Sequence, residues 1–281
     1  MSFVNKEQAE YWSDRAATWA QFDDRLETIA GVPGQLAMKR LKLGPGQRVV
    51  DLGCGTGGTT MQIAELVAPD GSAIGADIAE EMINAAVRRA GERQVTNVLF
   101  RHLDVQSGDL GEVAFDAAYS RFGVMFYADP VAAFTNVRRA LKPGGSLSFV
   151  CWMPLDQNEW MLVPGMAAVS ATGQLPNVPG PDEPGPFSLA DATKVRSVLD
   201  RAGFKDVDIE PHTDTVTLAE SELDMMSDLS TRVGAVSEII KTIGEELREQ
   251  VRTAIADELR SRLDGGQVRL KRAVLLVAAR A

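Results

Sequence analysis

The sequence has few cysteines and histidines, no excess of basic residues and no long apolar run. Its two cysteines, Cys54 and Cys151, are too few for a disulfide framework, and no Cys/His spacing suggests a zinc site. A transmembrane helix needs about 20 consecutive apolar residues, and the stretch 273–279 is far too short. We therefore expect no metal, no disulfide scaffold and no membrane association.

The charge balance argues against a nucleic-acid partner. The chain carries 29 Lys and Arg against 39 Asp and Glu, a net charge of −10, and has no basic run. Affinity for nucleic acid comes largely from Lys and Arg that neutralise phosphates. Residues 1–14 also lack the basic and apolar regions of a signal peptide. We expect a soluble cytoplasmic protein, and the sequence leaves a homodimer open.

The composition, 45% hydrophobic and 24% charged over 281 residues, is that of a globular protein. Short β-rich runs and helical patterns alternate five times between residues 48 and 152, which predicts a parallel sheet with helices on both faces. The predicted strands are 48–52, 72–76, 97–103, 115–120 and 146–152, and the predicted helices are 5–30, 35–43, 59–67, 79–91 and 130–141. The motif Gly31-Val-Pro-Gly34 is expected to end the first helix, and residues 142–145 are expected to form a turn.

The rhythm changes after Trp152. Residues 153–186 are rich in Pro, Gly and Met and are predicted to form a lid, followed by a helix at 190–202. A strand at 204–212, mixed helices at 218–263 and a last strand at 269–279 complete the predicted order. We expect a helical cap (1–44), a nucleotide-binding-type core (45–152), a lid insertion with its helix (153–203), and closing strands and helices of the same domain (204–281).

A glycine-rich loop stands where the first predicted strand meets a helix. Glycines at this place permit a tight turn and let a ligand approach the backbone closely. The free N–H groups of the helix start favour a negative ligand group. Gly53, Gly55 and Gly58 also fit G-x-G-x-x-G, so the loop alone does not separate a dinucleotide from another adenosine cofactor.

Three aspartates narrow the choice of ligand. Asp51 lies two residues before the first glycine, where a carboxylate would face a cation rather than a pyrophosphate. Asp77 follows the second predicted strand and is placed for ribose hydroxyls; Asp104 follows the third and could accept a hydrogen bond from an adenine amine. Three carboxylates without a nearby lysine suit a ligand that carries a sulfonium, an ammonium and one carboxylate. We expect S-adenosylmethionine.

At these motifs the sequence resembles the class I S-adenosylmethionine-dependent methyltransferases. The matching segments are 50–57 (VDLGCGTG), 75–78 (GADI), 102–105 (HLDV), 115–120 (FDAAYS) and 141–145 (LKPGG), which span residues 45–152. Residues 120–130 (SRFGVMFYADP) are similar to the ubiquinone/menaquinone-biosynthesis group, which acts mostly on small molecules.

The resemblance implies a fold class and a cofactor site. The fold is α/β, a doubly wound Rossmann-like sheet of seven mostly parallel strands with an antiparallel last strand. The glycine loop would hold the methionine end, Asp77 the ribose, and Asp104 with the Val105 backbone the adenine, while Ser120 and Arg121 would face the methionyl group and the acceptor. The complete predicted set of cofactor-binding residues is Tyr11, Trp19, Asp51, Gly53, Gly55, Gly57, Thr59, Asp77, Ile78, Met82, Asp104, Val105, Ser120 and Arg121.

The acceptor site is predicted from aromatic and methionine side chains, because adaptable Met side chains suit an apolar ligand. The predicted residues are Trp12, Phe122, Met125, Trp152, Met153, Trp160 and Met161. The aromatics of the first helix could instead be its core face, and the Trp and Met cluster could be ordinary lid core. His212, after the sixth strand, is the candidate general base, although a packed histidine is the simpler interpretation of it and of His102.

We therefore expect a methyltransferase that acts on a small, apolar or aromatic molecule, with oxygen, nitrogen and carbon acceptors left open. Two alternatives belong to other classes: a non-catalytic module that binds S-adenosylmethionine, and a dinucleotide-dependent oxidoreductase. Positioning can supply most of the acceleration of a methyl transfer, so a base needs no sequence signature.

Overall fold

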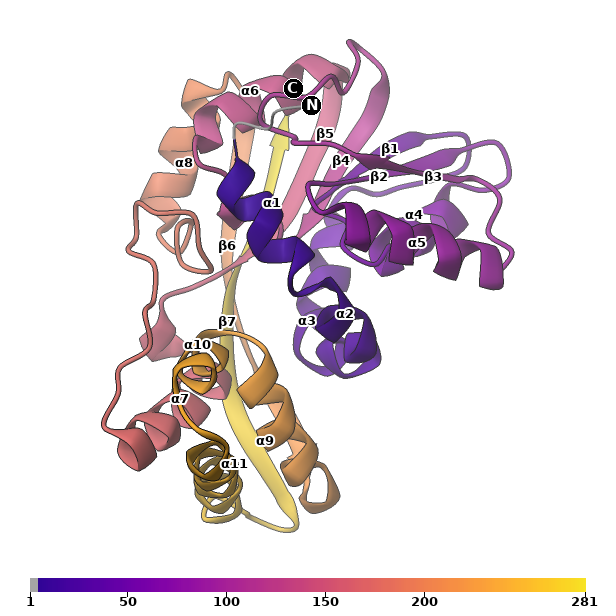
Figure 1. Cartoon of the computed structure of the whole chain (residues 1–281). Coiled ribbons are helices and arrows are strands. Elements are labelled where there is room, and N and C mark those ends of the chain that lie inside the picture. The colour runs from indigo at the N-terminus through magenta and orange to yellow at the C-terminus, as the bar shows by residue number, and fades with distance from the viewer. Residues whose placement is uncertain (1–4) are drawn as a thin grey trace.

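The computed structural model describes residues 5–281, and its centre is one seven-stranded sheet in the order β3-β2-β1-β4-β5-β7-β6 (Figure 1). The strands are β1 (Arg48–Leu52), β2 (Ser72–Asp77), β3 (Val98–His102), β4 (Phe115–Arg121), β5 (Leu141–Trp152), β6 (Lys205–Ala219) and β7 (Gln267–Arg280). β1 to β5 pair in parallel, and β7 runs antiparallel between β5 and β6. The predicted Rossmann-like sheet with an antiparallel last strand is confirmed.

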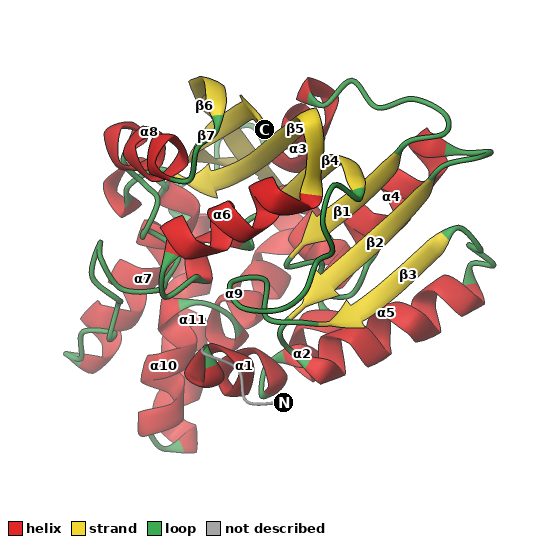
Figure 2. Ribbon diagram, turned by 90° about the horizontal axis from the view of Figure 1, so that it is seen from above, coloured by secondary structure: helices red, strands yellow, loops and turns green. Residues whose placement is uncertain are grey.

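Helices cover both faces of this sheet (Figure 2). Successive residues of β5 show the two faces: the Ser148 hydroxyl donates to Ala37 of α3, whereas Phe149 stacks on Phe134 of α6. The helices are α1 (Lys6–Ser13), α2 (Ala16–Gln21), α3 (Asp23–Arg40), α4 (Gly58–Val67), α5 (Glu80–Glu92), α6 (Pro130–Ala140), α7 (Glu159–Thr172), α8 (Ala192–Arg201), α9 (Leu223–Arg232), α10 (Ala235–Thr242) and α11 (Glu245–Arg260). The order of strands reverses at β1, between β2 and β4, and this is where doubly wound sheets bind ligands.

The expectation of one helix over residues 5–30 that ends at Gly31 is wrong. The segment forms α1, α2 and the start of α3, and α3 then continues through Pro33 to Arg40. A proline inside a helix leaves the carbonyl four residues earlier without its amide donor. The residue four positions before Pro33 is Ile29, and the Arg272 guanidinium donates a hydrogen bond to the Ile29 carbonyl. Tertiary contact therefore stabilises a helix that its own sequence would end.

Two further boundaries differ from the predictions. The residues 142–145, which were expected to form a turn, lie inside β5, because this strand begins at Leu141. The pairing of β5 with β4 is irregular there, with a register shift between Phe115 and Ala117 of β4. The sixth strand continues from the predicted 212 to Ala219, because β7 pairs with it over its whole length. Trp152, the last residue of β5, pairs with Val274 of β7. β6 and β7 continue to pair with each other beyond this point, to Ala219 and Gln267.

The outer halves of β6 and β7 support a second layer of helices. We call α7, α9, α10 and α11, with these strand halves, the helical lobe (Figure 1). α7, from the segment predicted as a lid, packs on α11, which begins 86 residues after α7 begins. The lobe is thus assembled from two separate parts of the chain, whereas the sequence suggested one continuous insertion. The domain division at residues 44, 152 and 203 stays a proposal.

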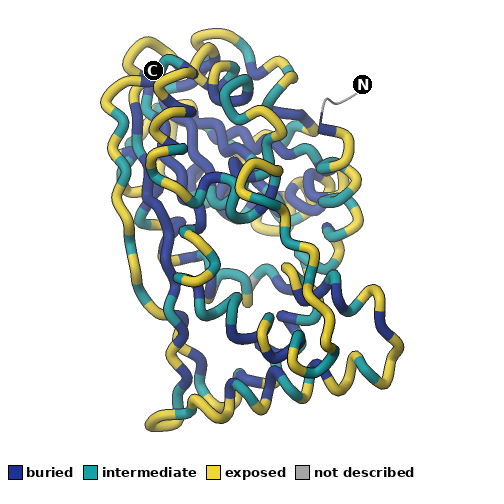
Figure 3. Tube along the Cα trace, turned by 90° about the vertical axis from the view of Figure 1, so that its left-hand side faces the viewer, coloured by how far each residue is buried: buried dark blue, intermediate teal, exposed yellow. Residues whose placement is uncertain are grey.

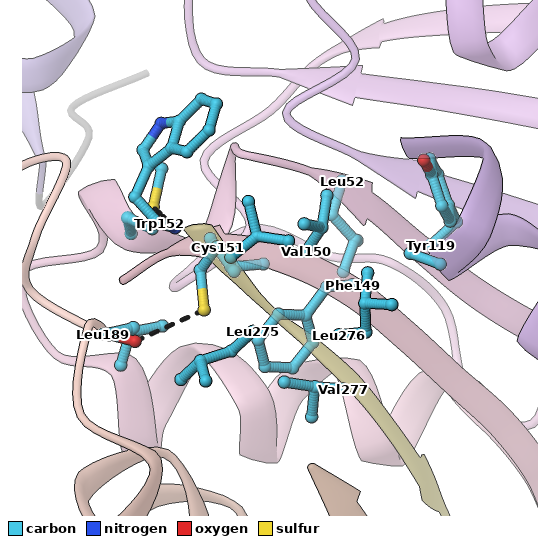
Figure 4. Packing of buried hydrophobic residues seen from close by; sticks show 14 of the residues in the cluster. Leu52, Tyr119, Phe149, Val150, Cys151, Trp152, Leu189, Leu275, Leu276 and Val277 are labelled. Carbon is cyan, nitrogen blue, oxygen red and sulfur yellow. Dashed lines mark hydrogen bonds between the residues drawn. The ribbon is translucent and has the colours of Figure 1, made fainter. Parts of the chain in front are cut away.

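Buried residues occur along the chain in both the sheet and the lobe (Figure 3), and they belong to one hydrophobic cluster. Phe149, Val150 and Cys151 lie beside Leu275 and Val277 at the centre of this core, and the Cys151 thiol contacts the Leu189 carbonyl at 3.3 Å (Figure 4). Among residues 5–281, no helix is long and apolar enough to cross a membrane. The same residues contain no group of three or more His, Cys, Asp or Glu that could hold a metal ion.

Candidate functional site

The glycine loop between β1 and α4 takes the strained form that its sequence predicts. Gly53, Gly55 and Gly57 have φ angles of +68°, +53° and +81°, a region that side chains with a Cβ rarely adopt. A Cβ at Gly57 would lie 2.8 Å from the Phe100 ring, so this glycine permits packing. A Cβ at Gly55 would meet nothing within 4 Å, so this glycine instead faces open space at the switch point of the sheet.

Asp51 is fully buried beneath this loop. One of its carboxylate oxygens, Oδ2, accepts hydrogen bonds from the hydroxyls of Thr59 at 2.6 Å and Thr60 at 2.7 Å. The other oxygen, Oδ1, is buried and has no hydrogen-bond partner in the part of the chain that the structure describes. Burial raises the pKa of Asp51 to about 6, although the two hydroxyls oppose the shift. A buried, half-satisfied carboxylate is prepared to receive a donor or a cation.

Asp77, at the end of β2, shapes the loop from the side. Its Oδ2 accepts the Gly55 amide at 2.8 Å and its Oδ1 accepts the Ala79 amide at 2.9 Å. Burial raises the pKa of the carboxyl, and the backbone donors oppose this effect. The carbonyl of Ile78, the next residue, lies 2.9 Å from Nε2 of His102. His102 is exposed on the edge strand, so the expectation of a packed core histidine is wrong, because β3 has no further strand beside it.

Asp104 follows β3 and is buried with a complete set of donors. The side-chain amide of Asn5 donates to both of its oxygens, at 2.9 and 3.1 Å, and the Asn5 backbone N–H adds a contact of 3.3 Å. The Gln106 amide and the Ser107 hydroxyl donate at 2.9 and 3.0 Å. Val105 is buried beside it. Asn5 was not among the predicted site residues, since an asparagine before a helix is usually a local cap.

The end of β4 joins the loop to α3. The buried Ser120 hydroxyl donates to the Leu52 carbonyl at 2.7 Å, which holds Gly123 against Gly53. Arg121 pairs with Glu27 of α3 at 2.5 Å. Its positive charge partly opposes the rise that burial causes in the pKa of Asp51. Ser120 therefore acts on the backbone of the loop, whereas Arg121 adds charge near it.

A second contact between α3 and the loop has no counterpart among the predicted site residues. Arg89 of α5 pairs with Asp23 at 2.6 Å and donates to the Thr56 hydroxyl, also at 2.6 Å. The Thr56 hydroxyl in turn donates to Asp23 at 2.7 Å. This triad connects the start of α3, the glycine loop and α5. Its members lie 33 to 66 residues apart, so no local pattern reveals it.

The aromatic residues of α1 and α2 lie over the start of α5. Trp12 contacts Trp19 and Phe126 edge to face, with ring centroids 5.2 and 4.8 Å apart. Both tryptophans pack on a small buried cluster that contains Met82 and Ala79, close to Asp77. Tyr11 contacts Trp12 edge to face, with ring centroids 5.3 Å apart, and the Arg15 guanidinium covers its ring at 3.4 Å.

Arg15 connects these first helices to the helical lobe, because it forms an ion pair with Glu238 of α10. The structure therefore brings the predicted Trp12, Trp19 and Met82 together beside Asp77. Tyr11 lies beside Trp12 and under Arg15, whose ion pair with Glu238 reaches the lobe.

A second aromatic group marks the ends of β4 and β5. Phe122 and Trp152 stack with centroids 3.8 Å apart and planes within 10°, and Trp160 of α7 lies 5.0 Å from Trp152. Phe122 has a φ of +58°, a strained conformation for a residue with a large side chain. The Trp160 indole N–H is buried without a hydrogen-bond partner among residues 5–281.

The methionines predicted with this group have different places. Met125 is 1% exposed, and its sulfur lies 3.5 Å from the Trp152 amide, so it packs against the end of β5. Met153 and Met161 are partly buried against the core. Any role of Met125 toward a ligand would act through Trp152.

His212 is distant from the glycine loop in the order of strands. It lies on β6, four strands from β1, which corresponds to about 19 Å at a strand spacing of about 4.8 Å. Its Nε2 is 3.5 Å from the carboxylate of Asp214, which also pairs with Arg272. The structure does not bring His212 next to the loop, and its role as a base stays a prediction. The Cys54 thiol inside the loop is buried, which raises its pKa and keeps it protonated.

The arrangement fits S-adenosylmethionine in three respects. The free Asp51 oxygen suits the ammonium or the sulfonium, which are cations. The open space at Gly55 leaves a backbone surface that a ligand can approach. The aromatic faces of the tryptophans suit a positively charged sulfur.

Comparison with known proteins identifies a methyltransferase domain in this chain. A family profile described as a methyltransferase domain matches residues 49–145. An O-methyltransferase of Pyrenophora dematioidea is 29% identical over 69% of this chain and 70% of its own length. A demethylmenaquinone methyltransferase of Geobacillus sp. (strain WCH70) is 30% identical over 44% of this chain and 55% of its own length.

A solved structure shares the fold. The phosphoethanolamine N-methyltransferase 2 of Haemonchus contortus, in complex with phosphomonomethylethanolamine and S-adenosylhomocysteine, has a TM-score of 0.53 and 17% identity. The match covers 88% of this chain and 52% of that chain. The names of these proteins thus include an O-methyltransferase, an N-methyltransferase and a demethylmenaquinone methyltransferase, and the solved structure contains S-adenosylhomocysteine.

Proposed function

Because the chain belongs to the class I S-adenosylmethionine-dependent methyltransferases, we propose that it methylates a small, apolar or aromatic molecule. The observation that carries this proposal is the stacked pair of Phe122 and Trp152 at the carboxyl ends of β4 and β5. The Phe122 ring is half-buried and precedes Gly123, which packs against Gly53, so a flat acceptor bound along this ring would lie beside the glycine loop. Trp160 adds an N–H donor that no described residue satisfies, which suits one polar atom on an otherwise apolar acceptor.

In this proposal the protein contributes binding, orientation and exclusion of water. S-adenosylmethionine supplies an electrophilic methyl group with its leaving group already attached. Asp51 and Asp77 hold the positive and ribose parts, and the triad of Asp23, Thr56 and Arg89 keeps the loop in place. Trp12 and Trp19 cover the start of α5 and exclude water there. Correct orientation of two reactants can supply several kcal/mol of the barrier reduction.

A methyl-transfer screen tests the proposed function directly. The purified chain is incubated with S-adenosylmethionine labelled at the methyl group and with small molecules that are either flat and apolar or polar. We expect label in one or more of the flat molecules, with S-adenosylhomocysteine formed in equal amount. Tight binding of the cofactor without transfer to any acceptor class would favour a non-catalytic binding module instead.

Removing the Phe122 ring should impair the acceptor and spare the cofactor. We expect Phe122→Gly to lower kcat/KM for the acceptor by about 10–100-fold, since aromatic stacking and apolar burial are worth roughly 1.5–3 kcal/mol. The affinity for S-adenosylhomocysteine, measured by calorimetry, should change less than twofold.

Val113→Gly is the matched control, because Val113 also has a left-handed φ of +50° but is exposed at the opposite end of β4. Glycine relieves backbone strain at both positions, so only the loss of the ring differs. Equal kcat/KM values for the two variants would contradict an acceptor surface at Phe122.

Asp77→Ala should weaken cofactor binding by about 1–3 kcal/mol, because it removes an acceptor of ribose hydrogen bonds and leaves the amides of Gly55 and Ala79 unpaired. Calorimetry with S-adenosylhomocysteine measures the loss. The 2′,3′-dideoxy analogue serves as the control, since it lacks the ribose hydroxyls. A loss of equal size for both ligands would show that Asp77 only shapes the loop.

A further inference from the structure

The contact between Asn5 and Asp104 joins the first described residue to the far side of the predicted adenine site. Asn5 is 5% exposed and Asp104 is 1% exposed, so the contact is buried. The Asn5 side chain presents two groups: its amide N–H donates to Asp104 and to the Gln106 side chain at 3.2 Å, and its oxygen accepts the Ala128 amide at 3.1 Å. The oxygen and the nitrogen of this carboxamide are therefore both engaged by the core of the protein.

The carboxylate of Asp104 has no capacity left for another donor. An ionised carboxylate offers about four lone-pair sites. Four donors already use them: the side-chain and backbone N–H groups of Asn5, the Gln106 amide and the Ser107 hydroxyl. An adenine amine can bind Asp104 only if one of these donors leaves. The Gln106 and Ser107 donors belong to the same turn as Asp104, so Asn5 is the donor that can move away.

The Asn5 side chain and the edge of an adenine ring carry the same pattern of one hydrogen-bond donor beside one acceptor. A carboxamide carries an N–H donor beside an oxygen acceptor, and adenine carries its exocyclic amine beside a ring nitrogen that accepts. Asn5 thus engages one acceptor, Asp104, and one donor, the Ala128 amide, and an adenine edge needs one of each. In this arrangement the Ala128 amide takes the role that the sequence assigned to the Val105 backbone. The Tyr127 hydroxyl, next to Ala128, is buried and without a hydrogen-bond partner within residues 5–281. It is available to a ligand in the same place.

The helix that follows Asn5 is held weakly enough to move. α1 buries no residue completely, and no side chain caps its first turn. Its main attachments are the Asn5 contact at one end and Trp12 with Arg15 at the other. Segments with few buried contacts open at low free-energy cost.

From these contacts we propose that Asn5 occupies the adenine subsite in the ligand-free protein and that cofactor binding displaces it. The proposal rests on the proposed function, because it takes Asp104 as the adenine ligand. In the ligand-free protein the contact between Asn5 and Asp104 holds the start of α1 against the core. Binding of the adenine exchanges that contact for its own, which releases the N-terminal end of α1 while Trp12 stays packed.

The test compares S-adenosylhomocysteine binding to the unchanged chain and to two variants. We expect Asn5→Ala to bind about tenfold more tightly, since the ligand no longer competes with a buried contact. Asn5→Asp, which keeps the shape but places a second carboxylate beside Asp104, should also bind more tightly at pH 8. Lys6→Ala is the control, because exposed Lys6 forms its ion pair with Glu10 on the same helix, and the affinity of this variant should equal that of the unchanged protein.

The outcomes are distinct. Equal or weaker binding by Asn5→Ala would overturn the proposal, because Asn5 would then support Asp104 in the bound state. An analogue without the exocyclic amine should gain clearly less from Asn5→Ala than S-adenosylhomocysteine does, and an equal gain would also count against displacement. In NMR spectra the side-chain amide signal of Asn5, assigned from the variant, should shift to the position of a solvated amide on ligand addition. If no protein in the series binds the ligand, the proposed function itself fails.

Discussion

Asp51→Asn is expected to stabilise the ligand-free protein and to weaken its binding of S-adenosylhomocysteine. Burial raises the pKa of Asp51 from 3.8 to about 6, and a tenfold change in a protonation equilibrium corresponds to about 1.4 kcal/mol. The folded state therefore loses about 3 kcal/mol by keeping this carboxylate ionised above pH 6. Asparagine retains an oxygen for Thr59 and Thr60. Its amide N–H would lack a partner, so we expect a net gain of about 1–2 kcal/mol in the free energy of unfolding at pH 8.

The stabilising effect of Asp51→Asn on the folded protein should depend on pH. A carboxyl group with a raised pKa in the folded state contributes stability below its unfolded pKa of about 3.8 and loses it as the pH rises through about 6. Urea unfolding at pH 5 and pH 8 should thus show the advantage of Asp51→Asn over the unchanged protein at pH 8 only. No difference between the two pH values would show that Asp51 does not titrate in this range.

Ligand binding should respond in the opposite direction. The ammonium group of S-adenosylhomocysteine favours the ionised carboxylate, so the affinity of the unchanged protein should rise from pH 5 to pH 7 and then level. Asp51→Asn should lose about 10–100-fold in affinity at pH 7.5, as expected for a charge-assisted hydrogen bond of about 1.5–3 kcal/mol. Its affinity should also become less dependent on pH. Calorimetry across this range measures both effects, and an unchanged affinity would remove Asp51 from the site.

The local features of the fold could be predicted because they depend on neighbouring residues. Strand and helix alternate with a clear change of period between residues 48 and 152, and β1, β2, β4 and α4 lie within a residue of their predictions. The glycine loop is identifiable for the same reason, since its three left-handed glycines follow one another on the chain. The aspartates at the ends of β1, β2 and β3 meet because parallel strands end at one edge of the sheet.

The features that could not be predicted depend on partners far away in the sequence. Gly31 and Pro33 have the composition of a helix end, yet α3 continues, because Arg272 reaches Ile29 across 243 residues. Asn5 and Asp104 are 99 residues apart, and Arg89 lies 66 residues from Asp23. The helical lobe requires α7 to pack on α11, which no local pattern encodes. Tertiary contacts in this chain thus override local preferences mainly around the first helices and the lobe.

Filling the space at Gly55 should abolish cofactor binding and leave the protein folded. Its φ of +53° would strain an alanine by about 1–2 kcal/mol, so Gly55→Asn is the better variant, because asparagine tolerates this conformation. A side chain here would enter the open space above the loop. We expect the affinity for S-adenosylhomocysteine to fall by more than about 100-fold, while the Tm falls by only a few degrees.

Two neighbouring glycines separate this steric effect from a general loss of structure. Gly58 also has open space at its Cβ position but begins α4 with ordinary backbone angles, so Gly58→Ala should fold normally and bind the ligand with an affinity close to that of the unchanged protein. Gly57→Ala should unfold the loop, because its Cβ would lie 2.8 Å from the Phe100 ring and 2.9 Å from Ala86. If Gly55→Asn binds as well as Gly58→Ala does, the ligand does not lie over the loop at Gly55, and the free oxygen of Asp51 beneath the loop must then serve another group.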